Sequence, residues 1–388
     1  MPDATDSRGP LDGLLILDLT RVLAGPYATM LLADLGARVI KVEAPGGDDS
    51  RAIGPFMAEG DSAYFTSVNR GKESIALDLK SAADLAVLEA MLAKADVVVE
   101  NFRPGAMERL GLGFEALHQR FPRLIYAAAS GFGHSGPESG RPAYDVIVQA
   151  MGGVMSITGE EGGAPVRVGT SLGDITAGLF TVIGIEAALL HREKTGRGQK
   201  VDVAMLDCQL AILENAIARY QVTGKSPGPL GSRHPSITPF QAFRCADRPI
   251  VIAAGNDALW LACCEALGLD AMAADARFAS NHSRTEHAAE LAAGVEARLT
   301  TADAAHWLAL LGAAGVPAGP LNTVGEALAM PQVAARNMLV ETHSPEGRPL
   351  KVAGNPIKMS AHPDPATRPS AARLDADRAR LVAEFAGT

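Results

Sequence analysis

One aspartate stands out within a run of small residues, Gly169-Thr-Ser-Leu-Gly-Asp-Ile-Thr-Ala-Gly178. Asp174 lies at a predicted loop that opens a long apolar helix, and small neighbours would leave room beside it for a bulky reactant. The positive end of a helix favours an ionised carboxylate, and free N–H groups there can bind an anionic oxygen. Such a carboxylate can attack an acyl carbon as a nucleophile. Aspartate is also a common helix cap, so spacing alone leaves both interpretations open.

Other catalytic signatures are missing from the sequence. No GxGxxG motif follows the first predicted strand, and neither a GxxxxGK[ST] nor a GxSxG motif occurs. The nine histidines are scattered, and none has the spacing of a metal site. We therefore predict no metal and no permanently bound cofactor.

Composition and charge narrow the class of partner. The chain has 388 residues, 47% of them hydrophobic, which is enough for two domains with separate cores. A formal net charge of −9 argues against a nucleic-acid partner, although a local basic pocket can still bind an anionic substrate. Gly, Asp or Glu interrupts the most apolar segments at short intervals, so we expect none of them to span a membrane.

The cysteines point to a reducing compartment. No CxxC pair is present, and no signal peptide precedes the first predicted strand. Few, unpatterned cysteines are typical of cytoplasmic proteins, so we predict a cytoplasmic protein with buried core thiols. The cysteines are Cys208, Cys245, Cys263 and Cys264.

Strands and helices alternate through the first part of the chain. Residues 14–18, 27–35 and 37–43 predict a strand, a helix and a strand, which together form a right-handed βαβ unit. The alternation continues, with strands at 74–78, 96–100 and 124–129 and helices at 81–95 and 106–120. This pattern predicts a doubly wound α/β fold, in which ligands bind at the loops that follow the strands. Such loops hold Arg21, Arg51, Asn101, Phe102 and Ser130.

Gly/Pro-rich stretches predict a smaller second domain. The chain is expected to be helical from 178 to 191, to form an edge strand or a short lead-in at 201–204, and to form one long helix at 207–221. Stretches at 223–236 and 315–320 are rich in Gly and Pro, as linkers are. We expect a large Rossmann-like domain over 1–200, a helix and linker over 201–224, a small α+β domain over 225–320, and a linker and C-terminal segment returning to the large domain over 321–388.

A series of ordered segments carries a family resemblance. They are Asp18-Leu-Thr-Arg-Val-Leu-Ala-Gly-Pro26, Leu35-Gly-Ala-Arg-Val-Ile-Lys-Val-Glu43, Asn69-Arg-Gly-Lys72 with Leu77-Asp-Leu-Lys80, Val99-Glu-Asn-Phe-Arg-Pro-Gly105, Gly131-Phe-Gly with Gly136-Pro, Lys194-Thr-Gly-Arg-Gly-Gln199 and Gly315-Val-Pro-Ala-Gly-Pro320. Together they resemble the signature segments of the class III CoA-transferases, the CaiB/BaiF type.

The resemblance implies a covalent mechanism and an assembly. The family's catalytic aspartate falls on Asp174, which would attack an acyl-CoA to give an acyl-aspartyl anhydride and then an aspartyl-CoA thioester. CoA or acyl-CoA would then be a substrate, with no ATP or metal required. The family also forms dimers of two interlocked chains, so an interlocked homodimer is expected here.

The resemblance also places the CoA site. Lys80 and Arg109 suit phosphate by their charge, although most single Lys or Arg residues are solvated surface charges. Some relatives have an arginine after the second strand where this chain has Ala44, so at least one contact to the phosphates of CoA must differ. The predicted CoA contacts are Val22, Ala24, Leu77, Lys80, Asn101, Phe102, Arg109, Ser130 and Phe132.

Within the family, the chain most resembles the succinyl-CoA:glutarate transferases. It has Tyr144-Asp145 where the 2-methylacyl-CoA racemases have a His-Asp pair, and this disfavours racemase activity. The Gly-rich run of the formyl-CoA/oxalate transferases is missing, whereas carnitine transferases are less easily excluded. Segments 234–243, 254–256 and 317–322 support the dicarboxylate group.

A dicarboxylate leaves one carboxylate unreacted, which needs a cation or other donors. The predicted substrate contacts are Arg51, Tyr144, Arg167, His234 and Ser236, with Arg70 and Arg233 as further candidates. Two hypotheses from other classes stay open at this point. They are an oxidoreductase on a dinucleotide fold, which the missing glycine motif disfavours, and a CoA-binding protein without activity, which the intact Asp174 segment disfavours.

Overall fold

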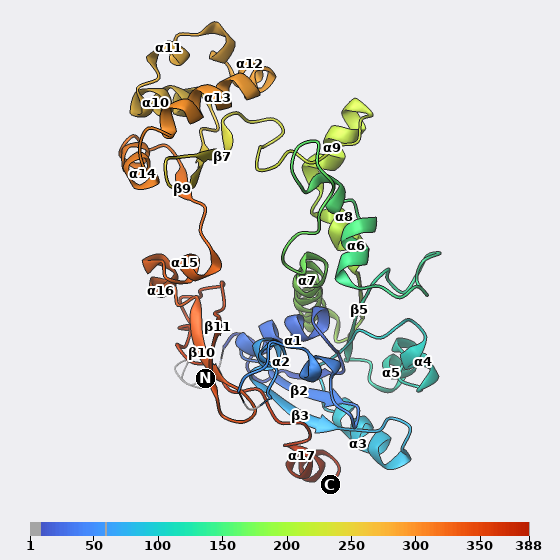
Figure 1. Cartoon of the computed structure of the whole chain (residues 1–388). Coiled ribbons are helices and arrows are strands. Elements are labelled where there is room, and N and C mark those ends of the chain that lie inside the picture. The colour runs from blue at the N-terminus through green and yellow to red at the C-terminus, as the bar shows by residue number, and fades with distance from the viewer. Residues whose placement is uncertain (1–8, 59, 388) are drawn as a thin grey trace. The chain divides into compact units, whose positions relative to one another are not determined.

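The computed structural model describes residues 9–58 and 60–387 (Figure 1). The chain divides into two compact units. The first unit comprises the chain up to Met155, Arg167–Lys225, and the chain from Pro331 onward. The second comprises Ser156–Val166 and Ser226–Met330.

A parallel sheet forms the centre of the first unit. In the described residues it has six strands, in the order β3-β2-β1-β4-β5-β6, and each strand pairs in parallel with its neighbours. This is the strand order of the doubly wound dinucleotide-binding fold, so the predicted α/β architecture is confirmed. The strands are β1 (Leu15–Asp18), β2 (Arg38–Glu43), β3 (Lys72–Ala76), β4 (Val97–Glu100), β5 (Ile125–Ser130) and β6 (Lys200–Ala204).

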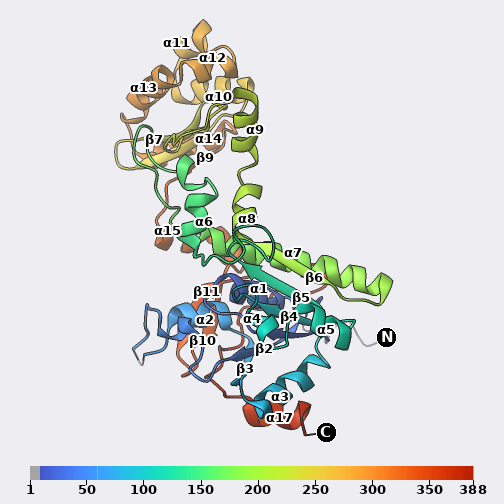
Figure 2. The same cartoon turned by 90° about the vertical axis from the view of Figure 1, so that its right-hand side faces the viewer.

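Helices cover both faces of this sheet (Figure 2). Because side chains alternate along a strand, Ile16 and Leu17 of β1 belong to cores on opposite faces. The Ile16 core includes side chains of α1 (Ala24–Asp34) and α7 (Leu172–Thr195). The opposite core includes side chains of α3 (Ala82–Leu92), α4 (Ala106–Arg109), α5 (Phe114–Arg120) and α17 (Arg378–Phe385). Strands covered on both sides are apolar along their whole length, which is why Val97–Val99 has no polar residue.

Two predicted helices are each two helices in the structure. The helix expected at 106–120 breaks into α4 and α5 around Gly111, whose φ of 71° is left-handed and ends the first piece. The helix expected at 207–221 is α8 (Met205–Ala211) followed by α9 (Glu214–Thr223). The apolar helix α7 begins at Leu172, earlier than predicted, so Asp174 lies in its first turn and not in a loop.

Helix α7 is more continuously apolar than the sequence analysis suggested. Among the described residues, this 24-residue helix is long and apolar enough to cross a membrane by length and composition. In the structure α7 packs along α1 and against β5 and β6, and its buried residues include Ala177, Val182 and Ile185. Its apolar composition therefore fits a core helix of the doubly wound fold.

Residues 201–225 and the C-terminal segment both belong to the first unit. The strand β6 extends the sheet at its edge beside β5, and α8 packs on α6 (Asp145–Met151) and α7, so this stretch is not a separate connection. The C-terminal part contains α16 (Pro331–Ala335), the hairpin of β10 (Leu339–His343) and β11 (Pro349–Ala353), and α17 against α3 and β3. Two short helices, η1 (Asp49–Ala52) and α2 (Ala63–Asn69), follow β2.

The second unit has its own core. Its described residues form an antiparallel sheet of β7 (Phe240–Arg244), β8 (Pro249–Ala253) and β9 (Ala318–Pro320). Trp260 and Trp307 are fully buried beside this sheet. Compared with the expected 225–320, this unit also includes 156–166 and extends to Met330. Its helices are η2 (Met155–Ile157, which begins in the first unit), α10 (Asp257–Leu267), α11 (Asp270–Ala273), η3 (Ala276–Phe278), α12 (Asn281–Glu286), α13 (Ala288–Leu299), α14 (Ala304–Ala313) and α15 (Val324–Leu328).

Candidate active site

A cleft opens in the first unit at the carboxyl ends of β1, β4 and β5. It lies where the strand order reverses between β1 and β4, which is the usual ligand position in such sheets. Three strand-end loops line it, together with Asp49, Ser139, residues 141–144 before α6, Asp174 of α7 and Met205 of α8. The loops contribute Arg21–Ala24, Asn101–Pro104 and Ala129–Gly131.

A second hollow adjoins this cleft at the ends of β1, β2 and β3. It is lined by Leu77 and Lys80 from the loop after β3, together with Ala44 and Pro45 after β2. Arg21 and Phe102 line both hollows, and the Arg21 guanidinium lies 5.5 Å from the centre of the Phe102 ring. One elongated ligand can therefore pass this pair and reach from the second hollow to Asp174.

Asp174 carries a carboxylate with an unusual environment. It is the third residue of α7, the helix is preceded by Ser171, and no hydrogen bond to the Asp174 side chain exists within the described part of the chain. Burial, assisted by the nearby charge of Asp145, raises the pKa of Asp174 to about 7, and Arg167 partly offsets that rise. Burial therefore acts against the preference for the ionised form that the helix end was expected to give.

Asp145 organises the entrance to α7. Its buried carboxylate accepts hydrogen bonds from Gln149 Nε2 (2.9 Å), Arg167 Nε (3.0 Å) and the backbone N–H of Gly173 (2.8 Å). Arg167 also donates to Ser171 Oγ (3.1 Å) and forms an ion pair with Asp145 (2.8 Å). Asp145, not Asp174, therefore anchors the first turn of the helix, which removes the capping interpretation of Asp174.

We expect Arg167→Gln to move the acid limb of the kcat/KM profile to higher pH, by about one unit. Arg167 lowers the pKa of Asp174, and its removal also leaves the Asp145 charge unbalanced, so both effects act in the same direction. Initial rates of the CoA transfer that the family resemblance implies, measured between pH 5 and 9, would show this shift.

Arg167→Lys is the matched control, because it keeps the positive charge while it loses the forked hydrogen bonds. We expect its acid limb to stay near that of the wild type. An unchanged limb in Arg167→Gln would mean that Arg167 does not influence the ionisation of Asp174.

The glycines around Asp174 serve helix packing. A Cβ atom on Gly173 would lie 2.6 Å from Val148 Cγ2, and one on Gly178 would lie 2.9 Å from the carbonyl oxygen of Ala24. Both distances are too short for a side chain, so these positions let α7 approach α6 and α1 closely. The expectation that the small residues leave room for a reactant was therefore wrong at these two positions.

The structure gathers most of the predicted CoA contacts around the two hollows. Leu77 and Lys80 line the second hollow. Arg109 is exposed and lines neither hollow, and Phe132 lies behind the cleft wall, where its ring is 5.5 Å from the guanidinium of the cleft residue Arg141. The predicted contacts that line the cleft with Asp174 are Val22, Ala24, Asn101, Phe102 and Ser130.

The predicted substrate arginines have structural partners. Arg51 forms an ion pair with Glu43 (2.7 Å), its guanidinium lies 3.8 Å from the centre of the Phe65 ring, and it lines neither hollow. Arg70 is buried against Asp34 (2.7 Å). A guanidinium held in this way is already neutralised, so neither arginine is placed to bind a distal carboxylate.

The remaining substrate predictions fall in different places. Tyr144 lines the cleft and is 74% exposed. His234 and Ser236 belong to the second unit, where the Ser236 N–H donates to His234 Nδ1 (3.1 Å). Arg233 of the same unit forms an ion pair with Glu161 (3.0 Å). These three residues belong to a different unit from the Asp174 cleft, and their substrate roles stay predictions.

Sequence reasoning missed several residues of this region. Burial, together with the charge of Asp174, raises the pKa of Tyr64 to about 12, so this α2 hydroxyl stays protonated close to the carboxylate. Arg103 and Arg141 bring two further cations to the cleft wall. Arg103 belongs to the family segment 99–105, although no role was predicted for it. No motif marks Tyr64 or Arg141, because only the folding of α2 and of the loop before α6 brings them near Asp174 or the cleft.

Glu100 fixes the start of the cleft loop that follows β4. This buried residue ends β4 and accepts hydrogen bonds from the Phe102 N–H (2.7 Å) and the Tyr126 hydroxyl (3.1 Å). Its burial raises the pKa of Glu100 to about 7. Within the residues that the structure describes, no group of three or more His, Cys, Asp and Glu side chains could hold a metal ion.

The family model for CoA-transferase family III matches residues 11–378. The chain belongs to CoA-transferase family III. It is 50% identical, over 98% of its length and 96% of the relative's, to the acetyl-CoA:oxalate CoA-transferase of Acetobacter aceti. It is 40% identical, over 99% and 98%, to a succinate–glutarate CoA-transferase of Agrobacterium fabrum. A succinyl-CoA:mesaconate CoA-transferase of Haloarcula hispanica is 42% identical over 97% and 96%.

Solved structures agree with this assignment to CoA-transferase family III. A CaiB/BaiF family protein from Brucella suis has a TM-score of 0.86 and 41% identity, covering 98% of this chain and 100% of its own. Rv3272 from Mycobacterium tuberculosis, as an aspartate-to-alanine variant, gives 0.86 and 34%, covering 97% and 100%. The predicted family and enzyme class are confirmed. The similarity to an oxalate enzyme also means that the missing Gly-rich run does not exclude oxalate as an acceptor.

Proposed function

We propose that this CoA-transferase moves CoA from a short acyl-CoA to a dicarboxylic acid, with Asp174 as the nucleophile. The Asp174 carboxylate carries this proposal: it lies in the cleft at the switch point of the sheet, without a hydrogen-bond partner within the described part of the chain. A pKa near 7 leaves a large fraction ionised at neutral pH while preserving more nucleophilic character than an ordinary carboxylate has.

The reaction would proceed through alternating anhydrides and thioesters. An Asp174 oxygen attacks the donor thioester carbon, the C–S bond breaks, and CoA leaves as the thiolate. The thiolate attacks the Asp174 carbonyl of the anhydride, which releases the donor acid and leaves an aspartyl-CoA thioester. The acceptor carboxylate attacks that thioester, and the released thiolate then attacks the acceptor carbonyl of the new anhydride. The product acyl-CoA leaves and the Asp174 carboxylate is restored. Each step exchanges one acyl bond for another, so the cycle balances without ATP or a metal.

CoA itself would occupy both hollows. The nucleotide end would lie beside Leu77 and Lys80, and the pantetheine arm would pass alongside the Arg21–Phe102 pair, which lines both hollows. The thioester would then reach Asp174. The exposed ammonium of Lys80 suits a phosphate of the nucleotide, and the stacked Arg21–Phe102 pair suits a narrow, partly apolar arm.

The acceptor would be a short dicarboxylic acid. The curated relatives act on oxalate, glutarate or mesaconate, as their names state, and each of these acids has two carboxylates. Arg21, Arg103 and Arg141 line the cleft. Arg21 and Arg141 form ion pairs with Asp49 and Glu138, so Arg103 is the best placed cation for the carboxylate that does not react. For the donor we propose succinyl-CoA. Acetyl-CoA with oxalate is the second candidate, which the 50% identical relative favours.

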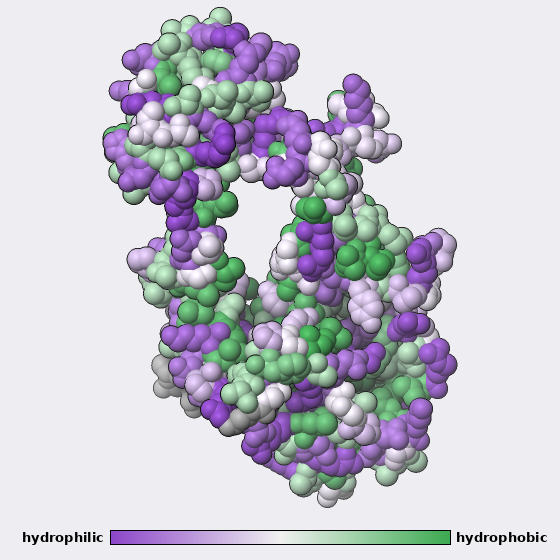
Figure 3. All heavy atoms as spheres, viewed as in Figure 1, coloured by the Kyte–Doolittle hydropathy of each residue, from purple (hydrophilic) through white to green (hydrophobic). Residues whose placement is uncertain are grey.

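We also propose an interlocked homodimer in the cytoplasm. The cysteines are free buried thiols, as suits a reducing compartment. An apolar surface lies on α6 and α7, and Figure 3 shows hydrophobic atoms gathered over α6. Exposed apolar patches of this kind mark contact surfaces between chains. The patch consists of Val146, Ile147, Met151, Leu179, Phe180 and Ile183.

A donor and acceptor panel tests the substrates. Succinyl-CoA and acetyl-CoA are each incubated with oxalate, glutarate, mesaconate, carnitine and propionate, and the acyl-CoA products are separated and identified by mass. We expect dicarboxylates to exceed propionate and carnitine by about 10-fold or more in kcat/KM, because the second carboxylate gains charged hydrogen bonds. Carnitine or propionate as the best acceptor would refute the dicarboxylate proposal. The same protein should exchange no α-hydrogen of a 2-methylacyl-CoA for deuterium, and exchange would support a racemase.

A further inference from the structure

Val22 holds a backbone conformation that its side chain disfavours. Its φ of 67° is left-handed. The other described non-glycine residues with positive φ are Asn337 and Asp375, whose side chains tolerate this region. For a β-branched residue it is an outlier, because the branched Cβ crowds the backbone. Val22 lines the Asp174 cleft, and Leu23, which follows it and precedes α1, also departs from the extended conformation usual before a helix (φ −135°, ψ −60°).

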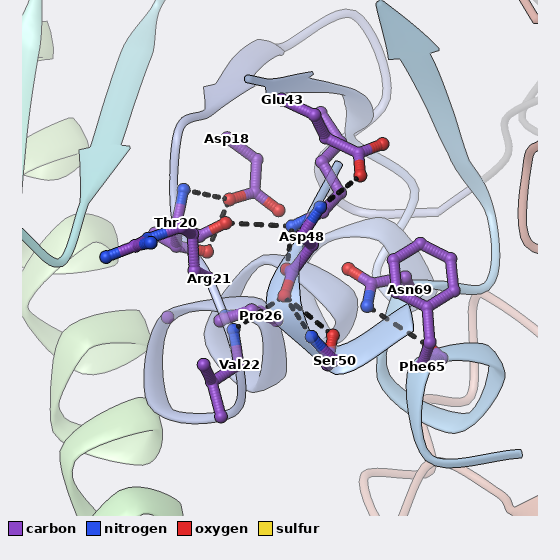
Figure 4. A network of polar contacts seen from close by, with 12 residues as sticks. Asp18, Thr20, Arg21, Val22, Pro26, Glu43, Asp48, Ser50, Phe65 and Asn69 are labelled. Atoms are coloured by element: carbon purple, nitrogen blue, oxygen red, sulfur yellow. Dashed lines mark hydrogen bonds and ion pairs between the residues drawn. The ribbon is translucent and has the colours of Figure 1, made fainter. Parts of the chain in front are cut away.

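A buried ion pair holds this turn in place. Asp48 Oδ1 accepts hydrogen bonds from the Val22 N–H (3.1 Å) and from the Ser50 N–H (2.9 Å) and hydroxyl (2.7 Å), as Figure 4 shows. Asp48 Oδ2 lies 2.8 Å from Lys41 Nζ, and the two side chains are 0% and 1% exposed. The group that restrains Val22 is therefore itself fixed by charge inside the protein.

The two preceding residues are clamped in the same way. Lys41 Nζ donates to the Thr20 carbonyl oxygen (2.8 Å), and the Thr20 N–H donates to Asp18 Oδ1 (2.9 Å). The Asn101 amide accepts from the Arg21 N–H (2.9 Å) and donates to the Arg21 carbonyl (2.8 Å). Side chains from β1, β2 and the loop after β4 thus fix the backbone of three consecutive residues in front of α1.

We propose that Asp48 is a positioning residue for CoA transfer: paired with Lys41, it holds Val22 in the left-handed conformation and so fixes the cleft wall of Val22, Leu23 and Ala24 beside Asp174. An unfavourable backbone conformation persists only where its surroundings over-determine it, and such sites concentrate where geometry serves function. A wall that is set before the substrate arrives need not be ordered during the reaction. The inference rests on the CoA transfer proposed above.

Replacing Val22 by glycine separates strain from function. Glycine accepts the left-handed conformation freely but does not enforce the path of the wall. We expect Val22→Gly to keep or raise the thermal unfolding midpoint, by a few degrees at most. We expect its kcat for CoA transfer to fall by about 10- to 100-fold, with a smaller change in KM. Opposite effects on stability and on kcat would not arise from a merely structural role.

Two controls accompany this variant. Val22→Ala also shortens the side chain but keeps a Cβ that restricts the backbone, so it should lose clearly less activity than Val22→Gly. Asn337→Gly makes the same kind of backbone change at a positive φ outside the cleft, and its kcat should match the wild type. An equal loss in Val22→Ala and Val22→Gly would assign the effect to side-chain contact and overturn the inference.

A double-mutant cycle tests Asp48 itself. Asp48→Asn keeps an acceptor but loses the attraction to Lys41, so we expect kcat to fall about 10-fold in the wild-type background. In the Val22→Gly background the wall is already free, so the same change should lower kcat by less than about 2-fold. Equal effects in both backgrounds would show that Asp48 acts without Val22 and would overturn the inference.

The affinity for free CoA gives a readout that does not depend on the acyl substrates. Titration calorimetry of wild type and Val22→Gly should show weaker binding in the variant, because the wall must be ordered on binding. Equal CoA affinity and equal kcat in these two proteins would overturn the inference. A wild type that binds CoA but uses none of the tested acid pairs would refute the proposed substrates alone, and the calorimetric comparison would still decide the role of the clamp.

Discussion

Asp174→Asn should abolish CoA transfer, lowering kcat by about 10³-fold or more, because the amide cannot form the acyl anhydride on which the proposed cycle depends. The measurement is transfer from the best donor of the panel, followed by mass. Intact-protein mass after incubation with donor alone provides a second readout, since only the wild type should gain an acyl or CoA adduct.

The same variant should be more stable than the wild type at alkaline pH. The folded-state pKa of Asp174 is about 7, above its ordinary value of 3.8, so the stability that the protonated carboxyl gives the wild type is lost as the pH rises from about 4 to 7. Asparagine has no such ionisation. We expect Asp174→Asn to gain roughly 2–4 kcal/mol in the free energy of unfolding at pH 8 and almost nothing at pH 4.

Asp207→Asn is the matched control, because Asp207 is an exposed acid in the first turn of another helix of the same unit. It should leave both activity and the pH dependence of stability unchanged. Transfer that survives in Asp174→Asn would remove the nucleophile from the mechanism, and equal stability of variant and wild type at pH 8 would mean that the carboxylate is not held out of water.

Lys41→Met should destabilise the protein by about 3–5 kcal/mol, because it leaves the fully buried Asp48 without its cation. Lys41→Met would remove more than the ion pair with Asp48. Lys41 also donates to the Thr20 carbonyl, and its charge lowers the pKa of the buried Asp18. Urea unfolding followed by circular dichroism measures the free energy of unfolding.

Two comparisons make this result specific. Arg120→Met breaks an ion pair with Glu89 whose side chains are both more than one third exposed, so it should cost less than about 1 kcal/mol. Adding Asp48→Asn to Lys41→Met removes the uncompensated charge and should recover part of the loss. A cost below that of Arg120→Met would contradict a buried, charge-paired clamp.

The pattern of the sequence predicted the fold well where the signal is local. Short apolar runs such as 14–18 and 96–100 form the central strands, because a strand buried on both faces has no room for polar residues. The sequence analysis was wrong about two helix boundaries. A glycine at 111 interrupts a helix that continuous periodicity suggested, and the first turn of α7 lies upstream of its most apolar stretch.

The sequence analysis also predicted some residues of the candidate site and was wrong about others. Asp174 and the loop residues Val22, Asn101 and Phe102 were found from motifs, and the structure gathers them in one cleft. Arg51 looked equally suitable because a side chain's partner is invisible in the sequence. The structure gives that partner as Glu43, and the ion pair leaves the guanidinium neutralised.

What the sequence determined by itself is therefore the order of strands and helices and the family, and it singled out Asp174 as the proposed nucleophile, since these depend on residues that are close along the chain. Only the tertiary structure decided the chemistry of that nucleophile. The burial of the site, together with the charge of Asp145, which lies 29 positions earlier in the chain, raises the pKa of Asp174 to about 7. The Asp48–Lys41 clamp on Val22 is likewise a product of folding, because burial and charge pairing arise only when separate strand ends meet.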